Sequence, residues 1–167
     1  MRAFKGTFRE PTEADLAFVA AHMREADRRE LKRWTAQEPG YELRHSVAVS
    51  DFCRAGVFED GAVACVFGAA RANLVDGTAV LWSLSTDEVD SRPREFCLGS
   101  KAGLDLLMRS MPDVGEFLNF VDLEYEAAAR WIEWFGGTFS ITTPRRAGVR
   151  GGVFRQFYIP NPYYKED

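Results

Sequence analysis

An almost uninterrupted apolar run lies near the middle of the chain, and turn signals bracket it. The run covers residues 62–70, with one Asp-Gly pair at 60–61 and another at 76–77. Asp-Gly pairs favour hairpin turns, because glycine reaches positive φ without steric cost. An apolar run of this length is typical of a central strand covered on both faces. The sequence therefore predicts three consecutive antiparallel strands, at residues 56–59, 62–70 and 78–86.

The segment before these strands has a mostly helical pattern. Residues 3–9 alternate loosely and predict a first strand, after which Thr12 is placed to cap a helix. The buried face of that helix would carry Leu16, Val19, Ala20 and Met23. The charged residues 24–37 are expected to continue as helix, and residues 41–53 to form another, with Val49, Phe52 and Cys53 turned inward.

The segment after the strands alternates between helix and strand. A helix is expected from the Pro at 93 to Met111, a buried strand at 117–121, and a helix at 124–135 that the glycine pair at 136–137 ends. Residues 138–142 and 153–159 would form a closing hairpin. The order β-α-α-β-β-β-α-β-α-β-β predicts the α/β class, with a mixed sheet and helices on both faces.

Size and charge limit the kinds of protein this chain can be. Its 167 residues fit a single domain spanning 1–167, and its net charge of −4 argues against nucleic acid as a partner. Three scattered cysteines and the lack of a Cys/His cluster predict no metal site and suit the reducing cytoplasm. No apolar stretch reaches the ~18 residues of a membrane span, so no membrane partner is expected.

The element order is similar to that of the GNAT family of N-acetyltransferases. The most specific stretch, residues 121–136, resembles the fourth helix of that family, where small and aromatic residues precede a leucine-glycine-phenylalanine step. Here that step reads Phe135-Gly136-Gly137, and the last aromatic is displaced to Phe139. The resemblance implies a GNAT-like fold and acetyl-CoA as the cofactor.

A narrower resemblance concerns a phage-encoded GNAT-like group related to internal virion proteins of short-tailed bacteriophages. It rests on the segments 23–27, 62–68 and 82–87, together with Glu30 and the Arg-Trp pair at 130–131. It implies a phage or prophage origin and a role in virion assembly or host interaction. Virion or host proteins would then be the partners, in the host cytoplasm or in the virion. The oligomeric state is not predicted.

The resemblance implies a phosphate-binding loop after the fourth strand, where the family has Gln/Arg-x-x-Gly-x-Gly/Ala. Residues 87–94 contain no glycine and three acids, which would repel phosphate. Arg92 and Arg94 are candidates to hold the phosphates by charge. The alternative is a solvated first helical turn that Ser91 caps.

The resemblance places the acyl group at a bulge near the end of the fourth strand. Leu84, Ser85 and Thr86 fall there and are the other candidate cofactor-binding residues. This assignment requires that the segments around Thr86 and Val121 lie side by side and parallel, with residues 92–111 crossing over between them.

Proton transfer would need an acid for the thiolate and a base for the amine. The family's usual tyrosine acid aligns with Ile132 here, so Tyr125 is the candidate acid, provided that the helix start faces the cleft. Otherwise Tyr125 is a surface or rim aromatic. Asp87, Glu88 and Asp122 are candidate bases, although Asp122 is equally well placed to cap the following helix.

The acceptor side would be lined by the first two helices. Asp27 and Glu30 lie three residues apart there, on one helical face with Arg24. They would form either an anionic pocket for an amine or an ordinary set of intrahelical ion pairs. Two functions follow: a degenerate GNAT-like phage protein, or an acetyl-CoA-dependent N-acyltransferase acting on an amine.

Overall fold

The strands form one mixed sheet. The computed structural model describes residues 3–73, 75–141, 145–146 and 148–166. Within them the sheet has the order β1-β2-β3-β4-β5-β8-β6, and β7 pairs with the free part of β8. The strands are β1 (Thr7–Arg9), β2 (Phe52–Val57), β3 (Val63–Asn73), β4 (Thr78–Ser85), β5 (Glu116–Asp122), β6 (Thr138–Phe139), β7 (Arg145–Arg146) and β8 (Val153–Pro160). The neighbours β4 and β5 run parallel, and the other neighbouring strands are antiparallel.

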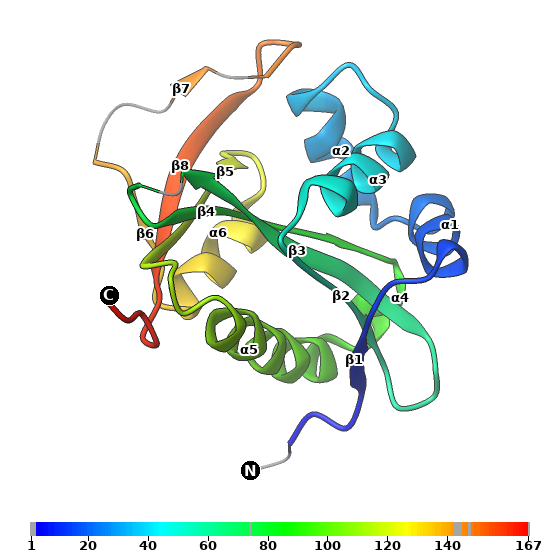
Figure 1. Ribbon diagram of the computed structural model, residues 1–167. Helices are drawn as coiled ribbons and strands as arrows, with labels where there is room; N and C mark the ends of the chain where they lie inside the picture. Colours follow the sequence, from blue (N-terminus) through cyan, green and yellow to red (C-terminus); the bar gives the residue numbers. More distant parts are fainter. Residues whose placement is uncertain (1–2, 74, 142–144, 147, 167) are drawn as a thin grey trace.

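Helices cover both faces of the sheet (Figure 1). One face carries α1 (Glu13–Ala21), α2 (Glu25–Trp34) and α3 (Pro39–Val49). The other carries α5 (Pro93–Ser110) and α6 (Glu126–Trp134), and a short α4 (Glu88–Ser91) precedes α5. The predicted α/β class with a mixed sheet is confirmed.

A separate core packs on each face of the sheet. The core under α5 and α6 includes Phe67 and Phe117, whereas the core under α1–α3 includes Val19, Leu43 and Val66. Val66 and Phe67 are neighbours on β3 and point to opposite faces, as successive strand residues must. The apolar run at the middle of the sequence is therefore a strand buried on both sides, as predicted.

Two of the expected helices differ from the observed ones. The helix expected over residues 41–53 ends at Val49, and Phe52 and Cys53 lie on β2, where they pair with Ala69 and Gly68 of β3. The helix expected to continue from residue 24 is instead separate, because Met23 forms a β-bridge with Thr86. In both places long-range strand pairing overrides the local helical pattern.

Other boundaries shift less. The first strand begins at Thr7 rather than at residue 3, and the polar segment after β4 contains the short helix α4. The loop within the closing hairpin contributes β7. Gly136 ends α6 with φ of +82°, as the glycine pair predicted.

Thr12 begins α1 with a complete capping box. Its hydroxyl accepts the Asp15 amide at 3.2 Å, and the Asp15 carboxylate accepts the Thr12 amide at 2.8 Å. We expect Thr12→Ala to lower the free energy of unfolding by about 1 kcal/mol, because the cap acceptor is lost. Urea denaturation measures this, with Thr12→Ser as the control that keeps the hydroxyl. An equal loss in both variants would contradict the capping role.

The crossover that the resemblance requires is present. Helix α5 connects β4 to its parallel neighbour β5. The pairing covers only Thr78–Val80 against Glu116–Leu118, so Thr86 and Val121 lie beyond the part of the two strands that is hydrogen-bonded. The two strands are thus parallel neighbours, as expected, but their carboxyl ends are not paired with each other.

Candidate functional site

An opening in the sheet separates β4 and β5 beyond their short ladder. We call this gap, between residues 81–85 and 119–122, the sheet opening. At its closed end the Asn119 side-chain amide donates to the Leu81 carbonyl at 2.6 Å. A side chain takes the place of a strand partner here, which marks the point where the two backbones separate.

Helix α2 lies across the other end of the sheet opening. Ser85, at the end of β4, donates its amide to the Asp27 carboxylate at 2.7 Å, and its carbonyl accepts the Arg24 amide at 2.8 Å. One helical turn after Asp27, the Glu30 carboxylate accepts the Asp122 amide of β5 at 3.0 Å. The two carboxylates therefore satisfy one backbone amide of each separated strand.

Ser83 lies between these two ends of the sheet opening. Backbone groups alternate sides along a strand, and Thr86 donates its amide to β3. The amide and carbonyl of Ser83 must then face away from β3, into the sheet opening. Its side chain is exposed although β4 is a central strand. Open space lies beside Ser83 where a neighbouring strand would otherwise pair with it.

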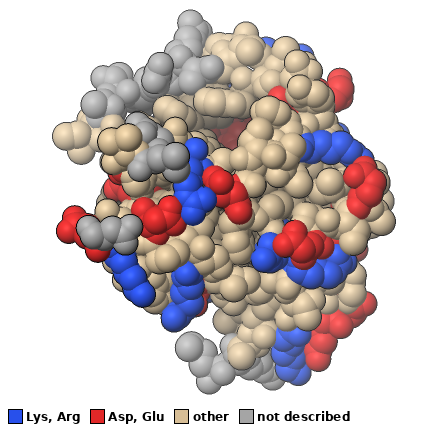
Figure 2. Space-filling view, viewed as in Figure 1, with Lys and Arg blue, Asp and Glu red and all other residues tan. Residues whose placement is uncertain are grey.

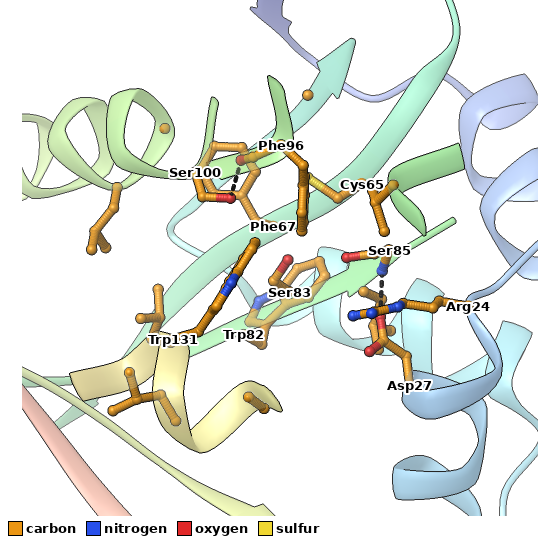
Figure 3. A pocket seen from close by; sticks show the side chains of 18 of the residues that line it. Arg24, Asp27, Cys65, Phe67, Trp82, Ser83, Ser85, Phe96, Ser100 and Trp131 are labelled. Carbon is orange, nitrogen blue, oxygen red and sulfur yellow. Dashed lines mark hydrogen bonds between the residues drawn. The ribbon is translucent and has the colours of Figure 1, made fainter. Parts of the chain in front are cut away.

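A cavity of about 490 Å³ includes the sheet opening. On the α5–α6 side its wall is apolar and includes Phe67, Phe96 and Trp131, with the last two rings 4.6 Å apart between their centroids (Figure 3). On the α1–α3 side the wall includes Trp34 and Trp82. The cavity thus has an aromatic wall on each side of the sheet and can hold ligands that approach from both faces.

The charged lining of the cavity is mostly acidic. Four carboxylates and one guanidinium belong to it among the residues described: Asp27, Glu30, Glu42, Asp90 and Arg24. On the face of the molecule that Figure 2 shows, acidic and basic side chains are interspersed over a largely uncharged background. The acidic lining of the cavity would favour a cationic ligand.

Tyr125 connects α6 to the cavity. It is the residue before the first turn of α6, and its hydroxyl donates to the Asp27 carboxylate and accepts from the Arg24 guanidinium, both at 2.9 Å. Arg24 also bonds to Asp90 at 2.7 Å. Burial, strengthened by the charge of Asp27, raises the pKa of Tyr125 well above its usual value. The helix start faces the cleft, which is the condition for Tyr125 to act as an acid.

Asp27 and Glu30 do not form intrahelical ion pairs. The hydrogen bonds of the Asp27 side chain go to β4 and α6, and that of Glu30 goes to β5. Burial raises the pKa of Asp27, although its hydrogen bonds oppose the shift. Burial, together with the charges of Asp27 and Asp122, raises the pKa of Glu30 to about 7. Both side chains line the cavity.

The candidate base Asp122 is fully engaged. Its side chain is 3% exposed, with one oxygen bound by the Arg33 guanidinium and the other by the Glu124 amide. It closes the turn before α6, whereas Tyr125 holds the cap position. The other candidates, Asp87 and Glu88, lie at the start of α4 and are not among the described lining residues of the cavity.

The loop expected to hold phosphates is closed by its own hydrogen bonds. The amides of Val89, Asp90 and Arg92 each donate to a carbonyl of the same loop. The Arg92 guanidinium pairs with Asp60 at 2.7 Å and also with Glu88. These amides and this charge are thus already satisfied within the protein.

The remaining cofactor candidates lie at two places. Arg94 is exposed on the first turn of α5. Leu84, Ser85 and Thr86 are buried, and the Thr86 hydroxyl bonds to the Val63 carbonyl of β3. Of these three, Leu84 and Ser85 line the cavity.

Comparison with solved structures identifies the fold. The chain superposes on spermidine N-acetyltransferase from Vibrio cholerae with a TM-score of 0.69 and 14% identity, covering 96% of this chain and 98% of that one. It superposes on ribosomal-protein-S5-alanine acetyltransferase from Vibrio fischeri with 0.69 and 10%, covering 99% and 98%. The protein has the GNAT fold. Ribosomal-protein-S18-alanine N-acetyltransferase from Escherichia coli also matches, with 0.61 and 15%, covering 97% and 96%.

Comparison of the sequence with family models and with curated proteins gives no match. The GNAT fold is thus established by the arrangement of the backbone. Over the residues that the structure describes, no group of three potential metal ligands is present. No helix in that part of the chain is long and apolar enough to cross a membrane.

Sequence reasoning missed two features of the site. Ser83 gave no signal, because its importance comes from the strand separation and not from its residue type. Trp131, which entered the sequence analysis only as part of the Arg-Trp pair at 130–131, lines the cavity beside Phe96. The alternation of β4, read together with the crossover, is the only signal that could have indicated Ser83.

Proposed function

We propose that this protein is a CoA-dependent N-acyltransferase that acts on an amine. The observation that carries the proposal is the sheet opening, where the amide and carbonyl of Ser83 face a cavity that spans the sheet. An extended amide-containing chain can pair with those two groups as a short extra strand, entering from the α5–α6 side. An amine can then reach the same point from the α1–α3 side.

The residues at the sheet opening suit acyl transfer. An amide directed at the acyl oxygen stabilises the negative charge that develops there when a nucleophile adds. Tyr125 lines the same cavity and carries a proton that it can give to a thiolate leaving group, while Asp27 and Arg24 orient its hydroxyl. The site thus has candidates for the oxyanion donor and the acid.

The structural relatives and the cavity charge support an amine acceptor. The three relatives act on spermidine or on an alanine of a ribosomal protein, and one was solved with CoA and spermine. The acidic lining of this cavity matches a protonated amine better than an anionic acceptor. The cytoplasm, which supplies acyl-CoA and amines together, is the proposed location.

The fit to CoA is good at the sheet opening and weak at the phosphate loop. The apolar α5–α6 wall and Ser83 suit the pantetheine arm, which carries two amides on a flexible chain. Phosphates would depend on Arg94 and on the positive end of the α5 dipole, because the amides of Val89, Asp90 and Arg92 are already used. CoA supplies the activated acyl thioester, and affinity for it is expected to be moderate.

The substitution Ser83→Pro tests whether the backbone amide of Ser83 binds acetyl-CoA. Proline removes the amide that faces the sheet opening, and that amide makes no ladder bond to β3, so the sheet should remain intact. We expect the Kd for acetyl-CoA, measured by isothermal titration calorimetry, to rise at least ~10-fold.

The matched control is Ser83→Ala, which removes the hydroxyl and keeps the amide, and it should bind like the wild type. Circular dichroism and the melting temperature show whether the proline variant folds. No binding of acetyl-CoA by the wild type, or equal binding by the folded proline variant, would overturn the proposal.

One observation favours a second function. The phosphate loop has no glycine, and three of its amides bond within the loop, which leaves fewer donors for the phosphates of CoA. A non-catalytic, phage-encoded protein for virion assembly or host interaction would have this property, with virion or host proteins as partners. Co-purification with portal or tail proteins, without any acetyl-CoA binding, would favour this alternative.

A further inference from the structure

Glu30 differs from the other carboxylates around the sheet opening. Both oxygens of Asp27 are bound, one by the Ser85 amide and one by the Tyr125 hydroxyl. Both oxygens of Asp122 are bound as well. The Glu30 side chain accepts one hydrogen bond, from the Asp122 amide to Oε2, and Oε1 has no partner among the described residues. One carboxylate oxygen is therefore available to a ligand.

The position of Glu30 fixes the direction from which that ligand comes. Asp27 and Glu30 bind the ends of β4 and β5, so Glu30 lies at the β5 edge of the sheet opening and lines the cavity. Leu31, the next residue, and Trp34, one turn further along the same helix, line the cavity too. An alkylammonium group that approaches from the α1–α3 side therefore meets the ring of Trp34 and the carboxylate of Glu30. Aromatic rings and carboxylates are the two kinds of group that bind such cations.

We propose that Glu30 is the catalytic base, which binds the ammonium group of the acceptor and takes one of its protons. The inference rests on the proposed acyl transfer and assigns a residue to a step that Asp87, Glu88 and Asp122 were first expected to perform. Glu30 receives the first proton, and the neutral nitrogen bonds to the acyl carbon. The carbon–sulfur bond breaks, and its electron pair goes to sulfur.

The protons balance without a further reactant. A second N–H proton leaves the nitrogen as the amide forms, and the sulfur ends as a thiol. Tyr125, which lines the same cavity, is the residue assigned to relay that proton. Glu30 then releases the first proton to solvent. The acyl thioester of CoA and a primary or secondary alkylamine are thus the only reactants required.

The electrostatics around Glu30 agree with this role. Two charged groups face Glu30: Asp27 of α2 and Asp122 of β5. Tyr125, just before α6, lies beside Asp27. The nearby cations do not neutralise Glu30, because Arg24 pairs with Asp90 and Arg33 pairs with Asp122. Burial and the two neighbouring carboxylates hold the pKa of Glu30 near 7. A base is most effective when its pKa lies near the working pH, because it is then both available and able to hold a proton.

Carbon-13 NMR of the full-length protein tests the site without turnover. The Glu30 carboxyl carbon, assigned by its loss in Glu30→Gln, should titrate with a midpoint near 7. Saturating spermidine should lower that midpoint by about one unit, because a bound cation favours the charged form. Glu30→Gln should weaken spermidine binding about tenfold, and Glu25→Gln, which removes a charge from the exposed face of α2, should not.

A thioester-cleavage assay with acetyl-CoA and spermidine tests the step itself. The wild-type kcat/KM should rise with pH around 7 and kcat about one unit lower, because bound spermidine lowers the Glu30 midpoint. Glu30→Gln should lower kcat about 100-fold and remove both midpoints, with acetyl-CoA affinity unchanged. An ordinary glutamate midpoint that spermidine does not move would overturn the inference, as would a wild-type pH profile in Glu30→Gln. If acetyl-CoA does not bind at all, the proposed function fails, and the NMR titration still decides whether Glu30 receives a cation.

Discussion

Replacing Phe117 by alanine should lower the free energy of unfolding by about 3–5 kcal/mol. Phe117 is fully buried at the start of β5, where this strand pairs with β4 on one side and with β8 on the other. Its ring packs in the core under α5 and α6. The loss combines the transfer of the ring from water with a cavity that the surrounding sheet cannot fill.

Urea denaturation of the variant measures this loss. The control is Leu123→Ala, because Leu123 is 42% exposed just beyond the end of the same strand and should change stability by less than ~0.5 kcal/mol. A loss below ~1 kcal/mol for the Phe117 variant would show that this core is loosely packed or that the ring lies elsewhere.

Asp27→Ala should have the second-largest effect, a loss of about 2–4 kcal/mol. The substitution leaves the Ser85 amide and the Tyr125 hydroxyl without an acceptor, and it removes the negative charge beside Arg24. A buried donor without an acceptor destabilises the folded state, because its removal from water is no longer offset by a hydrogen bond. This carboxylate links α2 to β4 and to the start of α6, in addition to the bonds that Arg24 makes to Ser85 and Tyr125.

The loss from Asp27→Ala should also depend on pH. Burial raises the pKa of Asp27 in the folded protein above its value in the unfolded chain, so between the two values the folded state binds more protons. The stability that this carboxyl contributes is therefore largest below the unfolded pKa, and it falls as pH rises through the folded pKa. Chemical denaturation at several pH values checks this sign.

Asp27→Asn is the matched control, because it keeps an oxygen acceptor at the same place. It should recover most of the stability that alanine loses, with a weaker dependence on pH. If the alanine variant were as stable as the wild type, the hydrogen bonds that Asp27 accepts from Ser85 and Tyr125 would contribute nothing to folding.

Much of the fold could be predicted from the sequence. The two Asp-Gly pairs and the apolar run at 62–70 determined the meander of β2, β3 and β4, because glycine chemistry and burial act locally. The helix spacing of α1 and α5 and the glycines after α6 determined where those elements lie. The order of the elements then predicted a mixed sheet with one parallel crossover.

The site was predicted only in part. Asp27, Glu30 and Tyr125 were named as candidates, and all three line one cavity. Their partners could not be predicted, since Asp27 reaches Ser85 across 58 residues and Glu30 reaches Asp122 across 92. Ser83 was missed because an exposed backbone amide has no sequence pattern.

Most of the elements, their order and their buried faces follow from the amino-acid sequence, since they depend on side-chain periodicity and on turn residues within a few positions. The separation of β4 and β5 after Val80, and the position of α2 across the gap, became known from the three-dimensional structure. That arrangement results from hydrogen bonds between residues far apart in the chain. Such bonds depend on where whole elements are packed, which no local pattern of residues encodes.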